Sequence, residues 1–284
     1  MRSFHLIELC CGSAALTMHL LGATRQIVPY QGSKWKVRRE LAGLLHRMGH
    51  TDLQQITLND IGPWGRTWKS LCHPMGLAII KAKLEHYASR DPREVYDELQ
   101  GQPLEGSCAA EHLFLQRLSF RGKAVGTVTV DGDEHWKSPG FNPDSAYGSN
   151  RENFGKIKPL VPSLIRVLGK VQDLKWPRTT VSQLDAGDVR VRRSAIPLVV
   201  YIDPPYVGTT AYPNGGLDRA AVVDLAVSWA QRGATVIVSE QESVYQLFDH
   251  GFGSVMLKAP SSDGKLFQTK GAEVATFFCA DNVR

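Results

Sequence analysis

The sequence predicts an α/β protein with a parallel, doubly wound sheet of seven strands, and three observations support this fold class. Seven short apolar runs, rich in β-branched residues and bounded by turn residues, are typical of buried strands; they span residues 4–9, 55–58, 180–184, 198–202, 235–239, 254–258 and 274–279. Helical patterns at residues 14–21, 217–231 and 243–248 alternate with these runs, as expected for a parallel sheet. Residues 259–272, between the last two runs, lack helical periodicity, so we expect an antiparallel hairpin at the sheet edge.

The residues between the second and third runs, 62–176, have a different texture. Their periodic pieces are helical, at residues 77–89, 94–100 and 109–120, and a segment rich in Gly, Asn, Ser and Tyr follows at residues 138–153. A structureless loop of this length inside a compact protein is improbable. We therefore predict that residues 1–61 and 176–284 form the main domain and that residues 62–175 form an inserted, mainly helical subdomain.

The composition is that of a globular protein in a reducing compartment. Hydrophobic residues make up 43% and charged residues 21% of the 284 residues, which is enough to build a sizeable core. No apolar stretch approaches the roughly 20 residues that span a bilayer, and the N-terminus lacks a signal-peptide pattern, so we expect a cytoplasmic location. An odd number of cysteines without C-x-x-C spacing predicts free thiols; they are Cys10, Cys11, Cys72, Cys108 and Cys279.

The strongest functional signal is the tetrapeptide Asp203-Pro204-Pro205-Tyr206, which directly follows the apolar run at residues 198–202. Two successive prolines end a strand and fix a turn without backbone donors, which leaves carbonyl groups free to accept hydrogen bonds from a ligand. A carboxylate and a carbonyl together can hold an amino group with its lone pair towards an electrophile. Tyr206 adds a ring on which a planar base can stack, worth roughly 1–3 kcal/mol. The alternative is a strand-ending turn with a buried tyrosine, although ligands bind at strand ends in α/β sheets.

Two further strand ends carry residues suited to a nucleotide-like ligand. Gly12 lies where the first strand turns into a helix, so backbone N–H groups and the helix N-terminus can meet the polar end of a ligand. Asp60 ends the second strand, where acidic residues bind ribose hydroxyls in nucleotide-binding α/β folds. Simple tight packing is the alternative at Gly12, because a lone glycine turn has low specificity.

Over nearly the whole chain, these segments resemble the Dam-like, DPPY-bearing family of DNA adenine methyltransferases of bacteria and phages. Residues 7–14 (IELCCGSA) are similar to the family's cofactor-binding strand and glycine turn, and residues 29–34 (PYQGSK) to its short cofactor segment. Residues 58–60 (LND) resemble the acidic end of the second strand, residues 114–122 (FLQRLSFRG) a helix with an N-R-x-x-F-N-G pattern, and residues 236–240 (VIVSE) the strand after the catalytic loop. Cys10 stands where the family usually has Phe, Ala14 where it has a second glycine, and residues 30–34 follow the glycine strand instead of preceding it.

The resemblance implies a Rossmann-like enzyme that transfers a methyl group from S-adenosylmethionine to the exocyclic amino group of a flipped-out adenine in double-stranded DNA, with or without sequence specificity. The glycine strand and the Asp203 strand should lie side by side at the topological switch point. The implied catalytic residues are Asp203, Pro204, Pro205 and Tyr206. The implied cofactor contacts are Glu8, Cys10, Cys11, Gly12, Ser13, Ala14, Tyr30, Lys34, Asp60, Asp185 and Asp203. Methyl transfer from a sulfonium needs no metal, so none is expected. The sequence leaves the oligomeric state open, with a monomer favoured.

The expected DNA contacts come from acid-poor basic stretches and from the inserted subdomain. The net charge is only +5, but residues 25–47 hold six basic residues against one acid, and residues 151–178 hold seven against two. Such stretches can track a phosphate backbone, although a solvated helix face has a similar composition. Arg117 and Arg121, four residues apart, should share one helix face. The full set of expected contacts is Lys34, Arg38, Arg39, Arg117, Arg121, Tyr147, Asn150, Arg151 and Lys158.

Three other functions remain open from the sequence. The same architecture can act on adenine in RNA, can methylate the amino group of cytosine, or can persist as a catalytically inactive DNA-binding protein. Cytosine enzymes typically begin the motif with Ser, and an inactive relative predicts a disrupted tetrapeptide, whereas Asp203 and the tetrapeptide are intact here. The sequence has no P-loop, no H-E-x-x-H and no G-x-S-x-G, and its nine histidines show no metal-ligand spacing.

Overall fold

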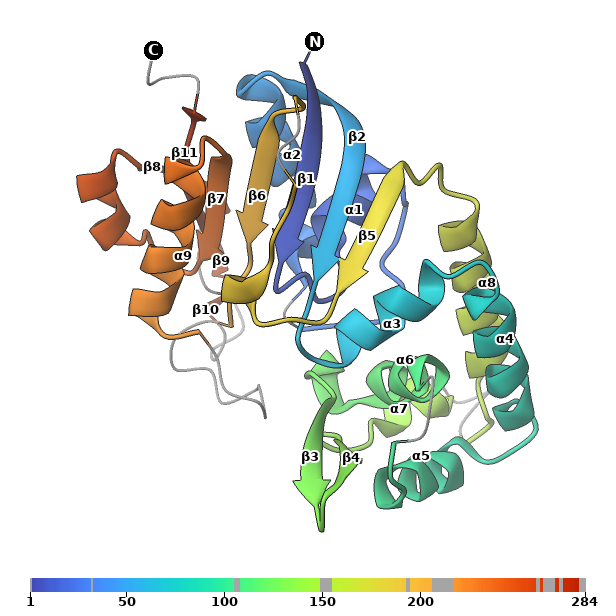
Figure 1. Ribbon diagram of the computed structural model, residues 1–284. Coiled ribbons are helices and arrows are strands. Elements are labelled where there is room, and N and C mark those ends of the chain that lie inside the picture. The colour runs from blue at the N-terminus through green and yellow to red at the C-terminus, as the bar shows by residue number, and fades with distance from the viewer. Residues whose placement is uncertain are drawn as a thin grey trace.

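The computed structural model is a mixed α/β protein with a seven-stranded sheet, as the sequence predicts (Figure 1). It describes residues 2–31, 33–104, 108–148, 155–192, 195–205, 217–258, 261–262, 269–270 and 273–280. The sheet strands are β1 (Arg2–Leu9), β2 (His50–Asn59), β5 (Arg178–Ser182), β6 (Leu198–Ile202), β7 (Thr235–Glu240), β8 (Gly253–Lys258) and β11 (Glu273–Phe278). A separate two-stranded pair joins β9 (Ser261–Ser262) to β10 (Thr269–Lys270).

The sheet order is β5-β2-β1-β6-β7-β11-β8, and its first five strands are parallel. The chain builds outwards from β1 to β2 and β5, and then returns to the other side of β1 with β6 and β7. This reversal creates a topological switch point between β1 and β6, where ligands bind in open α/β sheets. β11 pairs antiparallel with both β7 and β8, so the expected antiparallel pair is confirmed and β8 is its outer strand.

Alternating side chains give the sheet a separate apolar core on each face. Phe4 and Leu6 of β1 share a core with α1 (Ala15–Leu20) and α2 (Arg38–Arg47), and the short helix η1 (Lys34–Lys36) precedes α2. Ile7 and Leu9 of the same strand face η3 (Ala186–Asp188), α9 (Arg219–Gln231) and η4 (Tyr245–His250). Burying an aliphatic or aromatic side chain of this size is worth about 1.5–3 kcal/mol, so the two cores fix the register of the central strands.

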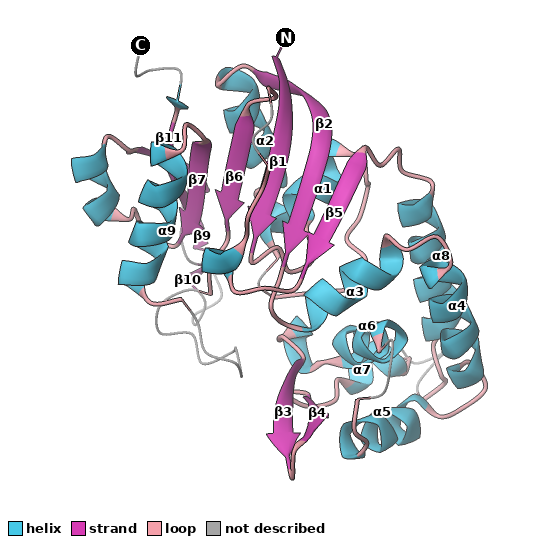
Figure 2. Ribbon diagram, viewed as in Figure 1, coloured by secondary structure: helices cyan, strands magenta, loops and turns pink. Residues whose placement is uncertain are grey.

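The residues between β2 and β5 form a helical region at one edge of the sheet, where Figure 2 shows most of the helices. Its helices are α3 (Pro63–Leu71), α4 (Gly76–Tyr87), α5 (Pro92–Gly101), α6 (Ala109–Leu118), η2 (Phe120–Gly122), α7 (Pro143–Ala146) and α8 (Leu160–Gln172). One core runs from Ile56 and Leu58 of β2 through Trp64 and Trp68 of α3 into these helices. No helix in the described ranges is long and apolar enough to cross a membrane.

A β-hairpin, absent from the prediction, projects from this helical region. Its strands are β3 (Gly126–Val130) and β4 (Asp133–Lys137). The two residues between them, Asp131 and Gly132, have φ of 52° and 94°, and positive φ at both central residues is typical of a tight hairpin turn. The region is therefore mainly helical but not wholly so.

Candidate active site at the ends of β1 and β6

The glycine turn and the D-P-P segment lie side by side at the switch point. Leu9, the last residue of β1, is the register partner of Ile202, the last residue of β6. The Asp203 N–H donates to the carbonyl of Leu9 over 3.2 Å, which continues the pairing one residue beyond β6. The predicted adjacency of the two strands is confirmed, because sheet pairing brings together segments that are far apart in the sequence.

The turn after β1 has a left-handed backbone at every second residue. Cys10, Gly12 and Ala14 have φ of 57°, 47° and 48°. A Cβ on Gly12 would lie 2.9 Å from Cε1 of Tyr30, so glycine is needed here for close approach as well as for its backbone angle. Ala14, which carries a Cβ, is held in the same left-handed conformation, which costs an L-residue roughly 1–2 kcal/mol.

Asp60 fastens this turn to the end of β2. Its carboxylate accepts hydrogen bonds from the N–H groups of Gly12 and Gly62, each over 2.9 Å. Burial raises the pKa of Asp60, and these backbone donors oppose that shift by favouring the charged form. From the other side, Trp68 Nε1–H donates to the carbonyl of Gly12 over 2.8 Å. The glycine turn is therefore held by hydrogen bonds from both β2 and α3.

Asp203 lies in a buried polar cluster formed by three elements. Lys34 Nζ, from η1, is 2.7 Å from Asp203 Oδ1, and Ser239 Oγ, from the end of β7, donates to the same oxygen over 2.9 Å. Lys34 is only 5% exposed. Burial raises the pKa of Asp203, while the Lys34 charge and both hydrogen bonds lower it. Lys34, predicted to contact cofactor or DNA, thus contacts the candidate catalytic carboxylate.

Two further buried acids lie around this cluster. Glu8 accepts a hydrogen bond from the Thr17 N–H of α1 over 2.5 Å, and burial raises its pKa to about 7. Glu240, which ends β7, lies 3.7 Å from Arg219, and burial raises its pKa to about 7 against the opposing charges of Arg219 and Lys34. The sequence analysis assigned no role to Ser239 and Glu240. Two polar residues at the carboxyl end of an apolar strand are the sequence feature that could have indicated a site there.

The other predicted cofactor residues divide between the turn and its surroundings. Ser13 Oγ donates to Ser33 Oγ over 2.8 Å, which ties the turn to the start of η1. Cys11 is buried and Cys10 half-buried, while the ring of Tyr30 lies over Gly12. Asp185 is exposed and accepts from Gly187 N–H over 2.8 Å at the start of η3. Pro204 is buried and Pro205 half-buried, whereas Tyr206 lies outside the described residues.

Several predicted DNA contacts are engaged within the chain. Arg38 donates to the carbonyl of Trp35 and stacks over its ring at 4.2 Å. Lys158 Nζ donates to the carbonyl of Asp144 over 2.6 Å. Arg39 is exposed. Of these three side chains, only Arg39 makes no hydrogen bond or ion pair with another residue that the structure describes.

The prediction that Arg117 and Arg121 share one helix face is wrong. α6 ends at Leu118, and Arg121 lies beyond it with a left-handed φ of 53°. Ser119, with ψ of 144°, leaves the helical conformation and turns the chain away. Arg117 is half-buried, and burial lowers its pKa.

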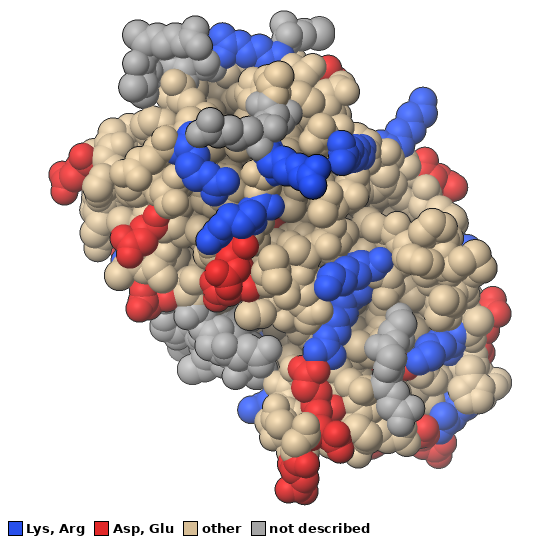
Figure 3. Space-filling view, in the orientation of Figure 1, with Lys and Arg blue, Asp and Glu red and all other residues tan. Residues whose placement is uncertain are grey.

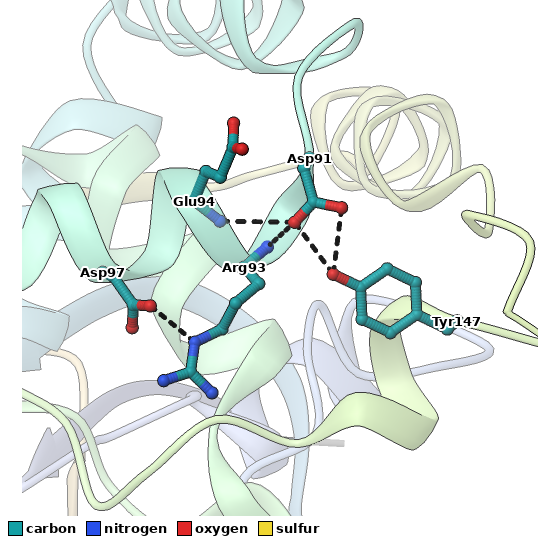
Figure 4. A network of polar contacts seen from close by, with 5 residues as sticks. All are labelled: Asp91, Arg93, Glu94, Asp97 and Tyr147. Carbon is teal, nitrogen blue, oxygen red and sulfur yellow. Dashed lines mark hydrogen bonds and ion pairs between the residues drawn. The ribbon is translucent and has the colours of Figure 1, made fainter.

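Tyr147 contacts a helix cap. Its hydroxyl donates to both oxygens of Asp91, over 2.9 and 3.1 Å, and Asp91 caps α5 by accepting from the N–H groups of Arg93 and Glu94 (Figure 4). This contact lowers the pKa of Asp91 and fixes the Tyr147 ring against the helical region. The predicted contacts Asn150 and Arg151 lie outside the described residues.

A basic surface covers part of the sheet, and two of its arginines, Arg190 and Arg192, lie outside the predicted basic stretches. Figure 3 shows several Lys and Arg side chains gathered across the upper and middle part of the view, with Asp and Glu side chains to the left and right of them and toward the lower end. Val189 and Val191 pack against the α9-side core, so the exposed Arg190 and Arg192 between and after them point outwards. Arg178 of β5 adds a third exposed charge. The signal in the sequence was the V-R-V-R alternation before β6.

Comparison with protein-family models finds no match for this chain, and comparison with curated proteins finds none either.

Proposed function

We propose that this protein transfers a methyl group from S-adenosylmethionine to the exocyclic amino group of adenine in DNA. The observation that carries the proposal is the position of Asp203. Its carboxylate stands at the switch point, directly beside the glycine turn at Gly12, with Pro204 and Pro205 following it. An enzyme of this kind needs an acceptor for amino protons next to a nucleotide-like cofactor. The Asp203 carboxylate can serve as the acceptor, and the turn at Gly12 can bind the cofactor.

The residues around Gly12 fit such a cofactor. Glycine at position 12 allows the Tyr30 ring to approach the turn, where a Cβ would lie 2.9 Å from the ring, and so places an aromatic side chain beside the turn for a cofactor to contact. Asp60, at the end of β2, has two oxygens with further acceptor capacity for ribose hydroxyls. We assign cofactor binding to Gly12, Tyr30 and Asp60. S-adenosylmethionine, when bound, supplies an electrophilic methyl group on its sulfonium.

Asp203 and the D-P-P turn hold the amino group of the target. The carboxylate of Asp203 accepts one amino proton and the carbonyl of Pro204 accepts the other, so the nitrogen lone pair is directed towards the methyl group. A base inside a duplex is out of reach of such a recessed carboxylate, so the adenine is flipped out at a cost of a few kcal/mol. Orientation of the two reacting groups then contributes much of the acceleration.

The test is methyl transfer from labelled S-adenosylmethionine to duplex DNA, single-stranded DNA and RNA, with the modified base identified by mass spectrometry. We expect N6-methyladenine in DNA. Asp203→Ala should reduce turnover by roughly 10²–10⁴-fold, since that is the usual contribution of a positioned catalytic group. Asp188→Ala, at an exposed acid of η3, is the matched control. An Asp203→Ala variant with more than a tenth of the wild-type turnover would overturn the role, and transfer to RNA alone or to cytosine would reassign the substrate.

A further inference from the structure

A chain of buried hydroxyl groups ends on Asp203. Tyr201 lies two residues before Asp203 on β6, and its hydroxyl oxygen is 2.9 Å from Ser239 Oγ on β7. Ser239 Oγ in turn lies 2.9 Å from Asp203 Oδ1. Tyr201 is 2% exposed and Ser239 0%, so solvent does not compete for these hydrogen bonds. The two strands thus place three oxygen atoms in a row beneath the candidate site.

The chemistry of the three groups fixes the direction of these hydrogen bonds. A carboxylate only accepts, and each hydroxyl has a single proton to donate. Ser239 therefore gives its proton to Asp203, and its oxygen accepts the proton of Tyr201. Burial raises the pKa of Tyr201 well above its usual value, and the nearby charge of Asp203 acts in the same direction, so Tyr201 remains a donor.

Two donors converge on one oxygen of Asp203. Ser239 reaches Oδ1 from β7, and Lys34 Nζ reaches the same atom from η1 over 2.7 Å. Among the residues that the structure describes, none donates a hydrogen bond to Oδ2 of Asp203. Donors from two different elements restrict rotation of the carboxylate, which leaves Oδ2 as the oxygen presented to a ligand.

We infer that Ser239 and Tyr201 are positioning residues, which hold Asp203 so that Oδ2 accepts an amino proton of the substrate. The identity of that substrate rests on the proposed function, whereas the hold on Asp203 does not. Oδ2 of an ionised Asp203 can only accept hydrogen bonds. It therefore attracts a ligand N–H group and repels a ligand carbonyl oxygen at the same position. The arrangement therefore selects amino-bearing bases over those with a carbonyl at the corresponding position.

The first test measures the hold on Asp203 without any reaction. In protein labelled with ¹³C at aspartate side-chain carboxyls, the signal of Asp203, assigned by its loss in Asp203→Asn, is titrated against pH. Ser239→Ala removes a hydrogen bond that stabilises the charged form, so the pKa of Asp203 should rise. Ser239→Thr restores a hydroxyl and should return the pKa towards the wild-type value. Tyr201→Phe should give a smaller rise, because it acts through Ser239.

The matched control removes a buried hydroxyl at the other end of the same strand. Thr235 begins β7, is 2% exposed, and its Oγ1 lies 3.1 Å from His50 Nε2, away from Asp203. Thr235→Val should leave the Asp203 titration unchanged. An Asp203 pKa that is the same in wild type, Ser239→Ala and Thr235→Val overturns the positioning role, whatever the protein catalyses.

The second test uses methyl transfer to duplex DNA. Misplacement of a reacting group is costly, so Ser239→Ala should lower kcat by roughly ten- to a hundredfold and leave KM for S-adenosylmethionine unchanged. The acid limb of its pH profile should move to higher pH, in line with the titration. A kcat equal to that of Thr235→Val overturns the inference. A shifted Asp203 titration in a protein that methylates no nucleic acid supports the positioning role and overturns the proposed function, so the two failures are distinguishable.

Discussion

Lys34 and Asp203 form an ion pair, with 2.7 Å between Nζ and Oδ1, in which the side chains are 6% and 14% exposed. The pair joins η1 to the end of β6, two elements separated by most of the chain. A buried ion pair must satisfy both partners, since removal of one leaves an uncompensated charge. The charge state of Asp203 therefore depends on Lys34.

The first prediction follows from this dependence. In Lys34→Met, the pKa of Asp203 should rise, because burial favours the neutral acid and the opposing charge is lost. The proposed methyl transfer uses the ionised carboxylate of Asp203, so under that proposal the acid limb of the pH–rate profile should move to higher pH. The control is Lys36→Met, an exposed lysine of the same 3-10 helix. An unchanged acid limb in Lys34→Met would argue against this coupling.

The second prediction concerns Gly12. Gly12→Ala should weaken S-adenosylmethionine binding by at least about tenfold, measured by calorimetry, because the new Cβ displaces the Tyr30 ring and strains the turn by roughly 1–2 kcal/mol. Gly22→Ala is the control for backbone strain alone, since Gly22 has φ of 88° but a Cβ there would meet no atom within 4 Å. Equal cofactor affinity in the wild type and Gly12→Ala would place the cofactor elsewhere.

The third prediction concerns stability at Ala14. Replacing this left-handed alanine with glycine should stabilise the protein by about 1 kcal/mol, less the entropy that glycine loses on folding. Ala15→Gly, at the first residue of α1, should instead destabilise it by roughly 0.5–1 kcal/mol. Denaturation midpoints in urea give both changes. If both substitutions change the free energy of unfolding equally, the left-handed backbone at Ala14 does not destabilise the folded protein.

The fourth prediction is a pH dependence of folding. His112 is 0% exposed, and burial lowers its pKa from 6.5 to about 3. The neutral ring is favoured in the folded state, so its contribution to stability is complete above pH 6.5 and is lost as the pH falls from 6.5 towards 3, by at most about 1.4 kcal/mol per pH unit. His112→Phe should flatten this slope, whereas His46→Gln, at an exposed histidine, should leave it unchanged. Equal slopes in the wild type and His112→Phe would refute the assignment.

The fifth prediction concerns the basic surface. If Arg39 and Arg192 contact phosphates, each substitution by alanine should reduce the slope of log K against log[salt] by about one, because one fewer counterion is released. Affinity should fall similarly on different DNA sequences. Arg93, paired with Asp97 on α5, is the control. Slopes that match the wild type would leave these arginines as ordinary solvated surface.

The sequence was most informative where one physical signal dominates. Apolar runs of 4–8 residues located the strands of the sheet, most clearly the central ones, because burial on both faces demands continuous hydrophobicity. The D-P-P-Y run located Asp203, because paired prolines fix a strand end. The alternation of strands and helices predicted a parallel sheet, and the adjacency of the glycine strand and the Asp203 strand was also predicted, but the full strand order was not.

The sequence was least informative where the outcome depends on tertiary contacts. Nothing local indicates that Lys34 pairs with Asp203, since the partners meet only after β6 lies beside β1. The hairpin at Asp131 and Gly132 had a recognisable D-G signal between alternating residues, which the helical interpretation of the region obscured. α6 ends at Leu118 although the apolar pattern continues, because the next residue, Ser119, adopts an extended conformation.

The hydrogen bond from Trp68 to the carbonyl of Gly12 links helix α3 to the glycine turn. Gly65 lies so close to the end of β2 that a Cβ there would be 2.0 Å from the carbonyl oxygen of Asp60, and Trp68 is fully buried one turn later. α3 is therefore held against the end of β2 at Gly65 and against the glycine turn at Trp68. A displacement of α3 from the sheet would break the hydrogen bond from Trp68 and so disturb the turn at Gly12 directly.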